Sequence, residues 1–296
     1  MAKVHTPSDR RLGWNGLGMQ LADCWQATVH GARHILIEQD FQPILEIRWE
    51  KNEGRSMAVV LPKICQQLGT AFGVAVSELI PPPPPFAAAA DRAHLAWLSW
   101  QNSDRPKALL WLSPSCQTMA LLRFTDLSPV ADAVLLHLIA SLRDSDNGTA
   151  TGEWSIQDIS FHPPHHFELD AFHMAAGLTS IGFKADHSKI VYYRLAPASE
   201  HLRRQSLRAI LQRLDGQKGQ NQCYNETANS CEYQAAPRGI AARLAAQLRR
   251  QKAYCWSRIW HLPLANRLLA VVFASNRPIP AELKDRLCRQ YAIQST

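Results

Sequence analysis

The sequence predicts an α+β protein made of two tandem pseudo-repeats, each a mainly antiparallel sheet with helices packed on one face. Two observations predict this class. Strand-like apolar runs are followed by segments whose apolar residues recur three and four positions apart, which is the spacing of one helix face. Tryptophan and proline also recur in the same order in both halves, at offsets of 135 to 160 residues. We therefore predict an internal duplication.

Residues 154–214 form the clearest unit. They read WSIQDISF, a bend rich in histidine and proline, LTSIGF, KIVYYRLA and PASEHLRRQSLRAILQRL. The first three apolar runs predict strands. In the last segment Leu207, Leu211 and Leu214 fall on one face of a helix, which a proline would open.

The other elements are weaker versions of this pattern. In the N-terminal half, we expect strands around Leu17 to Trp25, Ile35 to Ile37 and Ile44 to Trp49, and a helix opened by Pro62. A short helix FAAAADRAH, the strands LAWLSW, KALLWL and TMALLRF, and the helix VADAVLLHLIASLRD follow. The C-terminal half ends with the helix RGIAARLAAQLRRQK, the strands AYCWSRIWHL and RLLAVVF, and a helix opened by Pro280.

The duplication is predicted from five matches, one of which joins a pair of tryptophans to another pair. They pair Trp14 with Trp154, Pro62 with Pro197, Pro85 with Pro237, Trp97 and Trp100 with Trp256 and Trp260, and Pro129 with Pro280. The linker-like segment DSDNGTATG then separates an N-terminal repeat, residues 1–146, from a C-terminal repeat, residues 153–296. Five prolines at 81–85 form a stiff spacer inside the first repeat, and a polar stretch at about 216–236 is expected to be a mobile loop.

Composition indicates a globular protein. The chain has 296 residues, of which 46% are hydrophobic, and it has nine tryptophans. No apolar run reaches the roughly 20 residues that a membrane-spanning helix needs, so we expect no membrane insertion. The first residues lack the apolar core of a secretory signal, and the seven cysteines contain no CxxC pair. These features predict a cytoplasmic location.

Positive charge is concentrated in the second half. From Arg194 to the end there are 17 Lys and Arg against 6 Asp and Glu, a net of +11, whereas the preceding residues carry 15 against 19, a net of −4. The helix expected after Pro237 places Arg243, Arg249 and Arg250 largely on a different face from its leucines. These arginines are either a solvated helix face or the contact surface for an anionic partner.

A second arginine pattern occurs on strands. Arg48, Arg123 and Arg194 each lie between two large apolar residues. Since a strand alternates its faces, arginines whose neighbours pack against helices would point to the opposite side of the sheet. They would then line an open sheet face with outward tryptophans; alternatively, each arginine pairs with a neighbouring carboxylate.

Histidines cluster in FHPPHHFELDAFH. Such a density of imidazoles and carboxylates suits a metal site or acid/base chemistry, but two prolines break the segment and its spacing differs from HExxH. We expect a surface bend without a metal at the four positions His162, His165, His166 and His173. GxSxG, Walker and dinucleotide-binding signatures are missing from the sequence, so no cofactor is predicted.

These observations favour a non-catalytic interaction protein, an adaptor or regulator. Its partner would be another macromolecule, preferably a protein, bound through the basic helices or the arginine-bearing sheet face. Two alternatives stay open. One is nucleic-acid binding by the basic C-terminal half, although RNP, KH, zinc-finger and helix-turn-helix signatures are missing. The other is an enzyme that uses the histidine-rich bend at 162–173.

Overall fold

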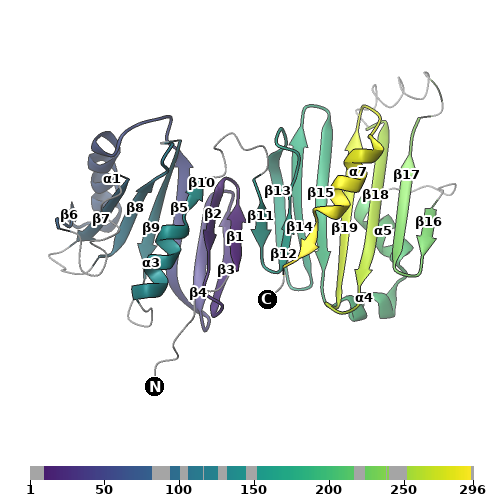
Figure 1. Cartoon of the computed structure of the whole chain (residues 1–296), viewed down its shortest axis with the longest axis horizontal. Helices are drawn as coiled ribbons and strands as arrows, with labels where there is room; N and C mark the ends of the chain where they lie inside the picture. Colours follow the sequence, from purple (N-terminus) through teal and green to yellow (C-terminus); the bar gives the residue numbers. More distant parts are fainter. Residues whose placement is uncertain are drawn as a thin grey trace. The chain divides into compact units, whose positions relative to one another are not determined.

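The computed structural model describes residues 10–81, 94–100, 106–115, 117–125, 132–144, 152–216, 224–237, 239 and 252–294. The chain divides into two compact units, which we call unit 1, up to residue 158, and unit 2, residues 159–295. Both are mixed α and β, and the pairings between their described strands are antiparallel (Figure 1). Among the described helices, none is both long and apolar enough to cross a membrane.

Unit 1 is built on a seven-stranded sheet with the order β3-β4-β5-β9-β8-β7-β6. A smaller antiparallel set runs β10-β2-β1-β11. The strands are β1 (Arg11–Trp14), β2 (Leu17–Gln20), β3 (Trp25–Gly31), β4 (His34–Gln39), β5 (Gln42–Lys51), β6 (Val76–Glu78), β7 (Leu95–Trp100), β8 (Ala108–Leu112), β9 (Thr118–Phe124), β10 (Arg143–Asp144) and β11 (Trp154–Ile156). Helix α1 (Met57–Phe72) follows β5, and helix α3 (Asp132–Ser141) precedes β10.

Unit 2 is also built on seven strands, in the order β13-β14-β15-β19-β18-β17-β16. The strands are β12 (Ile159–Phe161), β13 (Glu168–Ala175), β14 (Leu178–Ala185), β15 (Ser188–Leu195), β16 (Tyr224–Thr227), β17 (Ser230–Ala235), β18 (Tyr254–Leu262), β19 (Arg267–Ser275) and β20 (Ala292–Ile293). Helices α4 (Ala198–Arg204) and α5 (Leu207–Asp215) follow β15, and α7 (Ala281–Arg289) follows β19. Strand β20 pairs with β12.

The two seven-stranded sheets have the same strand order. Counting from β3 and from β13, each strand of one sheet has a counterpart at the same place in the other. The helices also enter at the same points, after β5 and β15 and again after β9 and β19. A shared order is what the predicted duplication requires.

Two of the residue matches behind that prediction were wrong. Trp97 lies in β7, the counterpart of β17, whereas Trp256 lies in β18, the counterpart of β8. Pro62 does not open a helix: it lies inside α1, which begins five residues earlier because Val60 already packs on the sheet. Pro197 and Pro280 do sit directly before α4 and α7. The matches at Pro85 and Pro129, and most of the 81–85 proline run, lie outside the described residues.

In unit 1, both faces of the sheet are covered where β7 and β8 pair with the first half of β9. On one face, Val60 of α1 packs with a buried cluster from β7, β8 and β9: Ala96, Leu98, Ala108, Leu110, Leu112 and Met119. The alternate residues Trp97, Leu109 and Leu122 are equally buried, on the opposite face. This explains why the central strands read as continuous apolar runs rather than as an alternating pattern.

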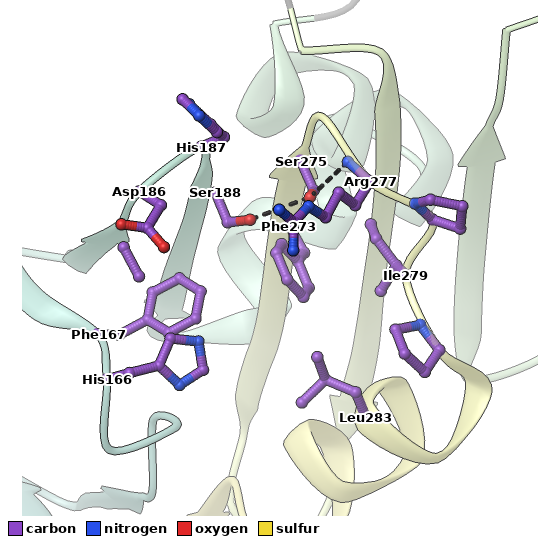
Figure 2. A pocket seen from close by; sticks show the side chains of 13 residues that line it. His166, Phe167, Asp186, His187, Ser188, Phe273, Ser275, Arg277, Ile279 and Leu283 are labelled. Carbon is purple, nitrogen blue, oxygen red and sulfur yellow. Dashed lines mark hydrogen bonds between the residues drawn. The ribbon is translucent and has the colours of Figure 1, made fainter.

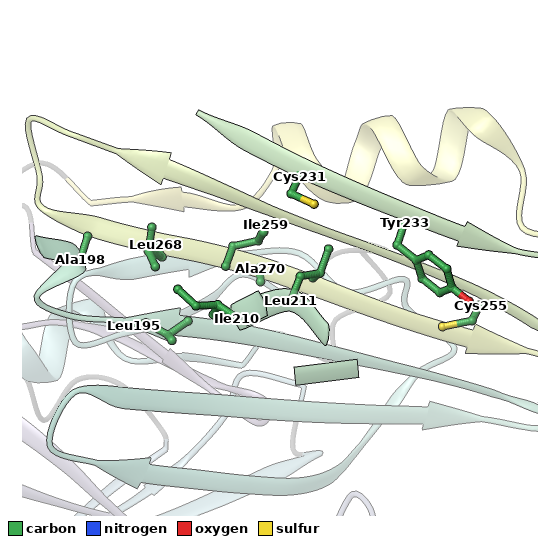
Figure 3. Packing of buried hydrophobic residues seen from close by; sticks show 10 residues of the cluster. All are labelled: Leu195, Ala198, Ile210, Leu211, Cys231, Tyr233, Cys255, Ile259, Leu268 and Ala270. Atoms are coloured by element: carbon green, nitrogen blue, oxygen red, sulfur yellow. The ribbon is translucent and has the colours of Figure 1, made fainter. Parts of the chain in front are cut away.

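The predicted placement of all helices on one face was wrong. In unit 2, Ile210 and Leu211 of α5 pack against Leu268 and Ala270 of β19 (Figure 3). Leu283 of α7 instead lines a pocket with residues of β19 that alternate with these, so α7 lies on the other face. An antiparallel sheet whose strands are apolar on both sides needs cover on both sides.

Three local predictions also need correction. The predicted mobile loop at 216–236 contains the β16–β17 hairpin, because Cys231 and Tyr233 alternate with polar residues and are buried under α5. The bend rich in histidine is present, but its second half forms strand β13. The long helix after Pro197 is two helices, since the Ser206 side chain accepts a hydrogen bond from the Ala209 backbone and starts α5 anew.

Candidate functional site

Four titratable side chains lie close together on the central strands of the unit 1 sheet. Glu46 and Arg48 are two apart on β5 and so share a face; Glu46 is directly paired with Arg123 of β9, and Arg48 with His34 of β4. We call these four residues the Glu46 cluster. Sheet geometry therefore brings together residues that are up to 89 positions apart in the sequence.

Glu46 is the centre of the cluster. Its Oε1 accepts from the Arg48 Nε at 2.9 Å and lies 2.8 Å from the Arg48 Nη2 and 2.9 Å from the His34 Nε2. Its Oε2 contacts the Arg123 Nη2. The Glu46 side chain is only 9% exposed, whereas those of Arg48 and Arg123 are 65% and 39% exposed. The cluster is thus a buried carboxylate that holds two partly open guanidinium groups.

The surroundings fix the charges of the cluster. Burial alone would raise the pKa of Glu46, but Arg123, Arg48 and His34 together outweigh it and lower that pKa below its usual value. Burial lowers the pKa of His34, and the Arg48 charge acts in the same direction against the pull of Glu46. At neutral pH the carboxylate is therefore ionised and the imidazole is neutral.

Helix α1 gives the cluster an apolar wall. Gly73 ends the helix in the left-handed region, at φ 66°, which leaves Phe72 as its last residue beside the sheet. The Phe72 ring stacks on Trp100 at 5.4 Å between centroids, and the Arg123 guanidinium lies 5.6 Å from its centre. Phe72 and Arg123 border an open pocket of about 290 Å³, which we call the Glu46 pocket. It is lined by Glu46, Arg48, Leu68, Ala71, Phe72, Leu121 and Arg123.

The counterpart face in unit 2 is filled. On β14, β15 and β19, the side toward α4 and α5 carries apolar side chains in one packed cluster: Leu178, Tyr193, Leu195, Leu268 and Ala270. Ala198 and Leu202 of α4 belong to the same cluster and cover those strands. In unit 1 a single helix stands in place of α4 and α5, and the corresponding strands β4, β5 and β9 carry the Glu46 cluster instead.

The predicted site residues separate into three groups. Arg48 and Arg123 come together, but on the side of the sheet that faces α1, because Ile47 and Leu122 are the ones buried on the other side. Arg194 lies on the side of its sheet opposite α4 and α5, where α7 lies, since Tyr193 and Leu195 on either side of it pack in the cluster under α4 and α5. The three arginines of the predicted basic helix, Arg243, Arg249 and Arg250, lie outside the described residues.

Sequence reasoning missed Glu46, His34 and Phe72. A signal for Glu46 was present, since Glu46 and Arg48 alternate with buried Leu45 and Ile47 and must share a face. Pairing of the strand arginines with a neighbouring carboxylate was the stated alternative to an open sheet face. Phe72 lies at the end of a helix far from the cluster in sequence, and only the fold brings it there.

The histidine-rich bend borders a different pocket, of about 220 Å³, in unit 2 (Figure 2). His166 lines it together with Phe167, whose ring meets Phe273 edge to face at 6.1 Å. Ser188 also lines it, but the Ser188 hydroxyl bonds to that of Ser275 at 3.0 Å rather than to an imidazole. Of the four histidines in the bend, His166 borders this pocket while His173 lies within β13.

Metal ligation can be examined for the described part of the chain. There, no group of three or more histidine, cysteine, aspartate or glutamate side chains is arranged to hold a metal ion. The described cysteines Cys24, Cys65, Cys231, Cys255 and Cys288 are free thiols. Burial raises the pKa of Cys231 to about 11, so this thiol stays protonated at neutral pH.

Comparisons with known proteins give little further information. No family model matches the chain, and no curated protein matches it. Among solved structures, the immunity protein TplEi of T6SS from Pseudomonas aeruginosa, complexed with "L" peptide, is similar over 93% of this chain and 99% of that chain. The identity is 14% and the TM-score 0.24, and a likeness this small supports no conclusion about fold or function.

Proposed function

We propose that this protein is a non-catalytic interaction protein, an adaptor or regulator, which binds another protein through the Glu46 pocket of unit 1. One observation carries the proposal. Where unit 2 closes the sheet face with leucines and α4, unit 1 keeps two arginines and an apolar wall open to solvent. Apolar surface next to arginine is typical of the centre of protein interfaces.

We also infer that the two halves are copies of one ancestral unit. The common strand order and helix positions support this inference. A duplicated pair frees one copy to specialise, and the filled face of unit 2 is the form expected of a structural copy. The face of unit 1 that keeps the Glu46 pocket is then the specialised one.

Nucleic-acid binding remains the second candidate, and it rests on a different region. The two arginines of the Glu46 pocket share one carboxylate, whereas strong phosphate binding uses about six to ten cationic contacts. The candidate therefore depends on the basic residues Arg243, Arg249 and Arg250. Their replacement by glutamate should weaken retention on DNA or RNA and lower its log–log salt slope by roughly 0.7 to 0.9 per lost phosphate contact.

The enzyme alternative depends on the histidine-rich bend. The described contacts around His166 place aromatic rings beside it, and the nearby Ser188 is bonded to another hydroxyl. Catalysis would be favoured if a nucleophile such as Ser188 were hydrogen-bonded to an imidazole that acts as its base, whereas the Ser188 hydroxyl bonds to that of Ser275. We therefore keep the non-catalytic function as the proposal.

The proposal is tested by affinity capture with the full-length chain as bait, followed by mass spectrometry. The bait carries either the native sequence, Arg48→Met with Phe72→Ala, or the control Arg203→Met. Arg203 is an exposed arginine of α4 that pairs with Glu200, so the control removes one surface charge outside the pocket. We expect proteins that bind the native and control baits and are lost from the double variant. Capture that is equal on all three baits would contradict binding at this pocket.

A further inference from the structure

We propose that the Glu46 pocket recognises an acidic side chain of the partner that stands next to a bulky apolar side chain. This inference rests on the proposed function and names the chemistry of the bound segment. Three properties of the pocket lead to it: unused donors on Arg48, which Glu46 already holds in place, an excess of positive charge, and an apolar wall that lines the same pocket as both arginines.

The first property is the orientation of Arg48. A guanidinium group has five N–H donors in a planar fork. Arg48 uses its Nε and Nη2 on Glu46, and its side chain is 65% exposed, so the remaining edge faces solvent. Glu46 fixes this arginine before any ligand arrives, which reduces the conformational entropy lost on binding. An oriented guanidinium edge matches the geometry of a carboxylate.

The second property is charge. Within the Glu46 cluster, two guanidinium groups face one carboxylate, and His34 is neutral at pH 7 because burial lowers its pKa. These four side chains therefore carry a net charge of +1. One carboxylate from a partner would bring the net charge to zero. A segment with a lysine or arginine at that place would be repelled.

The third property is the wall. Leu68, Ala71, Phe72 and Leu121 line the same pocket as the two arginines, and Phe72 is 41% exposed even though it stacks on Trp100. The volume of about 290 Å³ lies just below the roughly 300–1,000 Å³ usual for small-molecule sites. Such a space suits one or two side chains of a peptide. Burial of an apolar side chain on Phe72 would add affinity that charge alone cannot give.

Charge complementarity separates this occupant from others. A purely apolar segment would leave the free edge of Arg48 partly desolvated without a partner, which is costly. A nucleic-acid backbone would place phosphates beside Glu46 as well as beside the arginines. An acidic side chain followed by a leucine or an aromatic residue satisfies both the guanidinium edge and the wall.

A random 12-residue peptide library displayed on phage and selected on the full-length protein tests the proposal. Peptides retained from the native chain are counter-selected on a Phe72→Ala chain, so that those using the pocket are kept. We expect Asp or Glu to be enriched within four positions of Leu, Phe or Trp. For one selected peptide, synthesised with both ends capped, replacement of the acid by its amide should raise the Kd about 10-fold or more. On Arg48→Met this difference should vanish.

Other outcomes are distinguishable. Selected peptides that require Phe72 but show no acidic preference would overturn the carboxylate chemistry and leave the binding function standing. Peptides that bind the native, Arg48→Met and Phe72→Ala chains equally, or a selection that yields none, would count against the pocket as a binding site and against the proposed function with it. A peptide whose free carboxyl terminus, rather than its side chain, is essential would correct the source of the carboxylate.

Discussion

Replacing the two arginines of the Glu46 cluster, singly and together, should give strongly non-additive losses of stability. Arg48→Met leaves Glu46 with Arg123 and His34, and because Arg48 is 65% exposed we expect a loss of about 1 kcal/mol. Arg123→Met should cost about 1–2 kcal/mol, since this arginine is more buried and packs on Phe72. The double variant leaves an ionised carboxylate that is 9% exposed beside the neutral His34 and without either arginine, for which we expect a loss of about 3–5 kcal/mol.

Urea unfolding followed by tryptophan fluorescence measures these free energies, and hydrogen exchange of β4, β5 and β9 amides assigns the change to unit 1. Methionine keeps the length of the side-chain stem, so that loss of charge dominates. The double variant should exceed the sum of the single losses by at least about 1 kcal/mol, because either arginine alone can neutralise Glu46. Strictly additive losses would refute the view that the two guanidinium groups share one buried carboxylate.

Three other predictions concern pH, packing and backbone. Folding lowers the pKa values of Glu46 and His34, so the stability that these two groups contribute is full above their ordinary pKa values and is lost as pH falls. The urea midpoint should therefore be lower at pH 4 than at pH 7. Glu46→Gln should flatten the acid end of this pH dependence. Ile210→Ala should cost about 2–5 kcal/mol by urea unfolding, since Ile210 is fully buried in the unit 2 core, and the exposed Arg203→Ala should cost under about 0.5. Gly13→Ala should cost about 1–3 kcal/mol and lower the thermal midpoint by several degrees, because the added Cβ would lie 2.2 Å from the backbone oxygen of Glu153. An unchanged midpoint would mean that β1 and β11 separate freely.

Much of the fold could be predicted from local pattern. The helices that end each half were expected because Val134, Leu138 and Leu287 follow helical spacing, and they appear as α3 and α7. The strands KALLWL and RLLAVVF were recognisable because both of their faces are apolar. The two seven-stranded sheets share one strand order, but the tryptophan pair and Pro62 matches from which a duplication was predicted do not occupy corresponding places in them.

The failures have a common physical cause. Pairing between strands is a long-range property, so the edge hairpin of β16 and β17 looked like a polar loop until α5 was placed over Cys231 and Tyr233. The same holds for the candidate site. Arg48 and Arg123 were identified as unusual strand residues, but the face they share was set by which side of the sheet α1 covers. Sequence periodicity fixes alternation and leaves the choice of face to tertiary packing.

Site-specific photo-crosslinking tests the central claim most directly. A photoreactive phenylalanine analogue is placed at position 72, in the Glu46 pocket, or at position 59, where Val59 is 47% exposed near the other end of the same helix. Irradiated in the cells that make the protein, the chain labelled at 72 should form a discrete covalent adduct with another protein, and Arg48→Met should remove it. An adduct that forms equally from position 59, or that persists in Arg48→Met, would contradict binding at the Glu46 pocket.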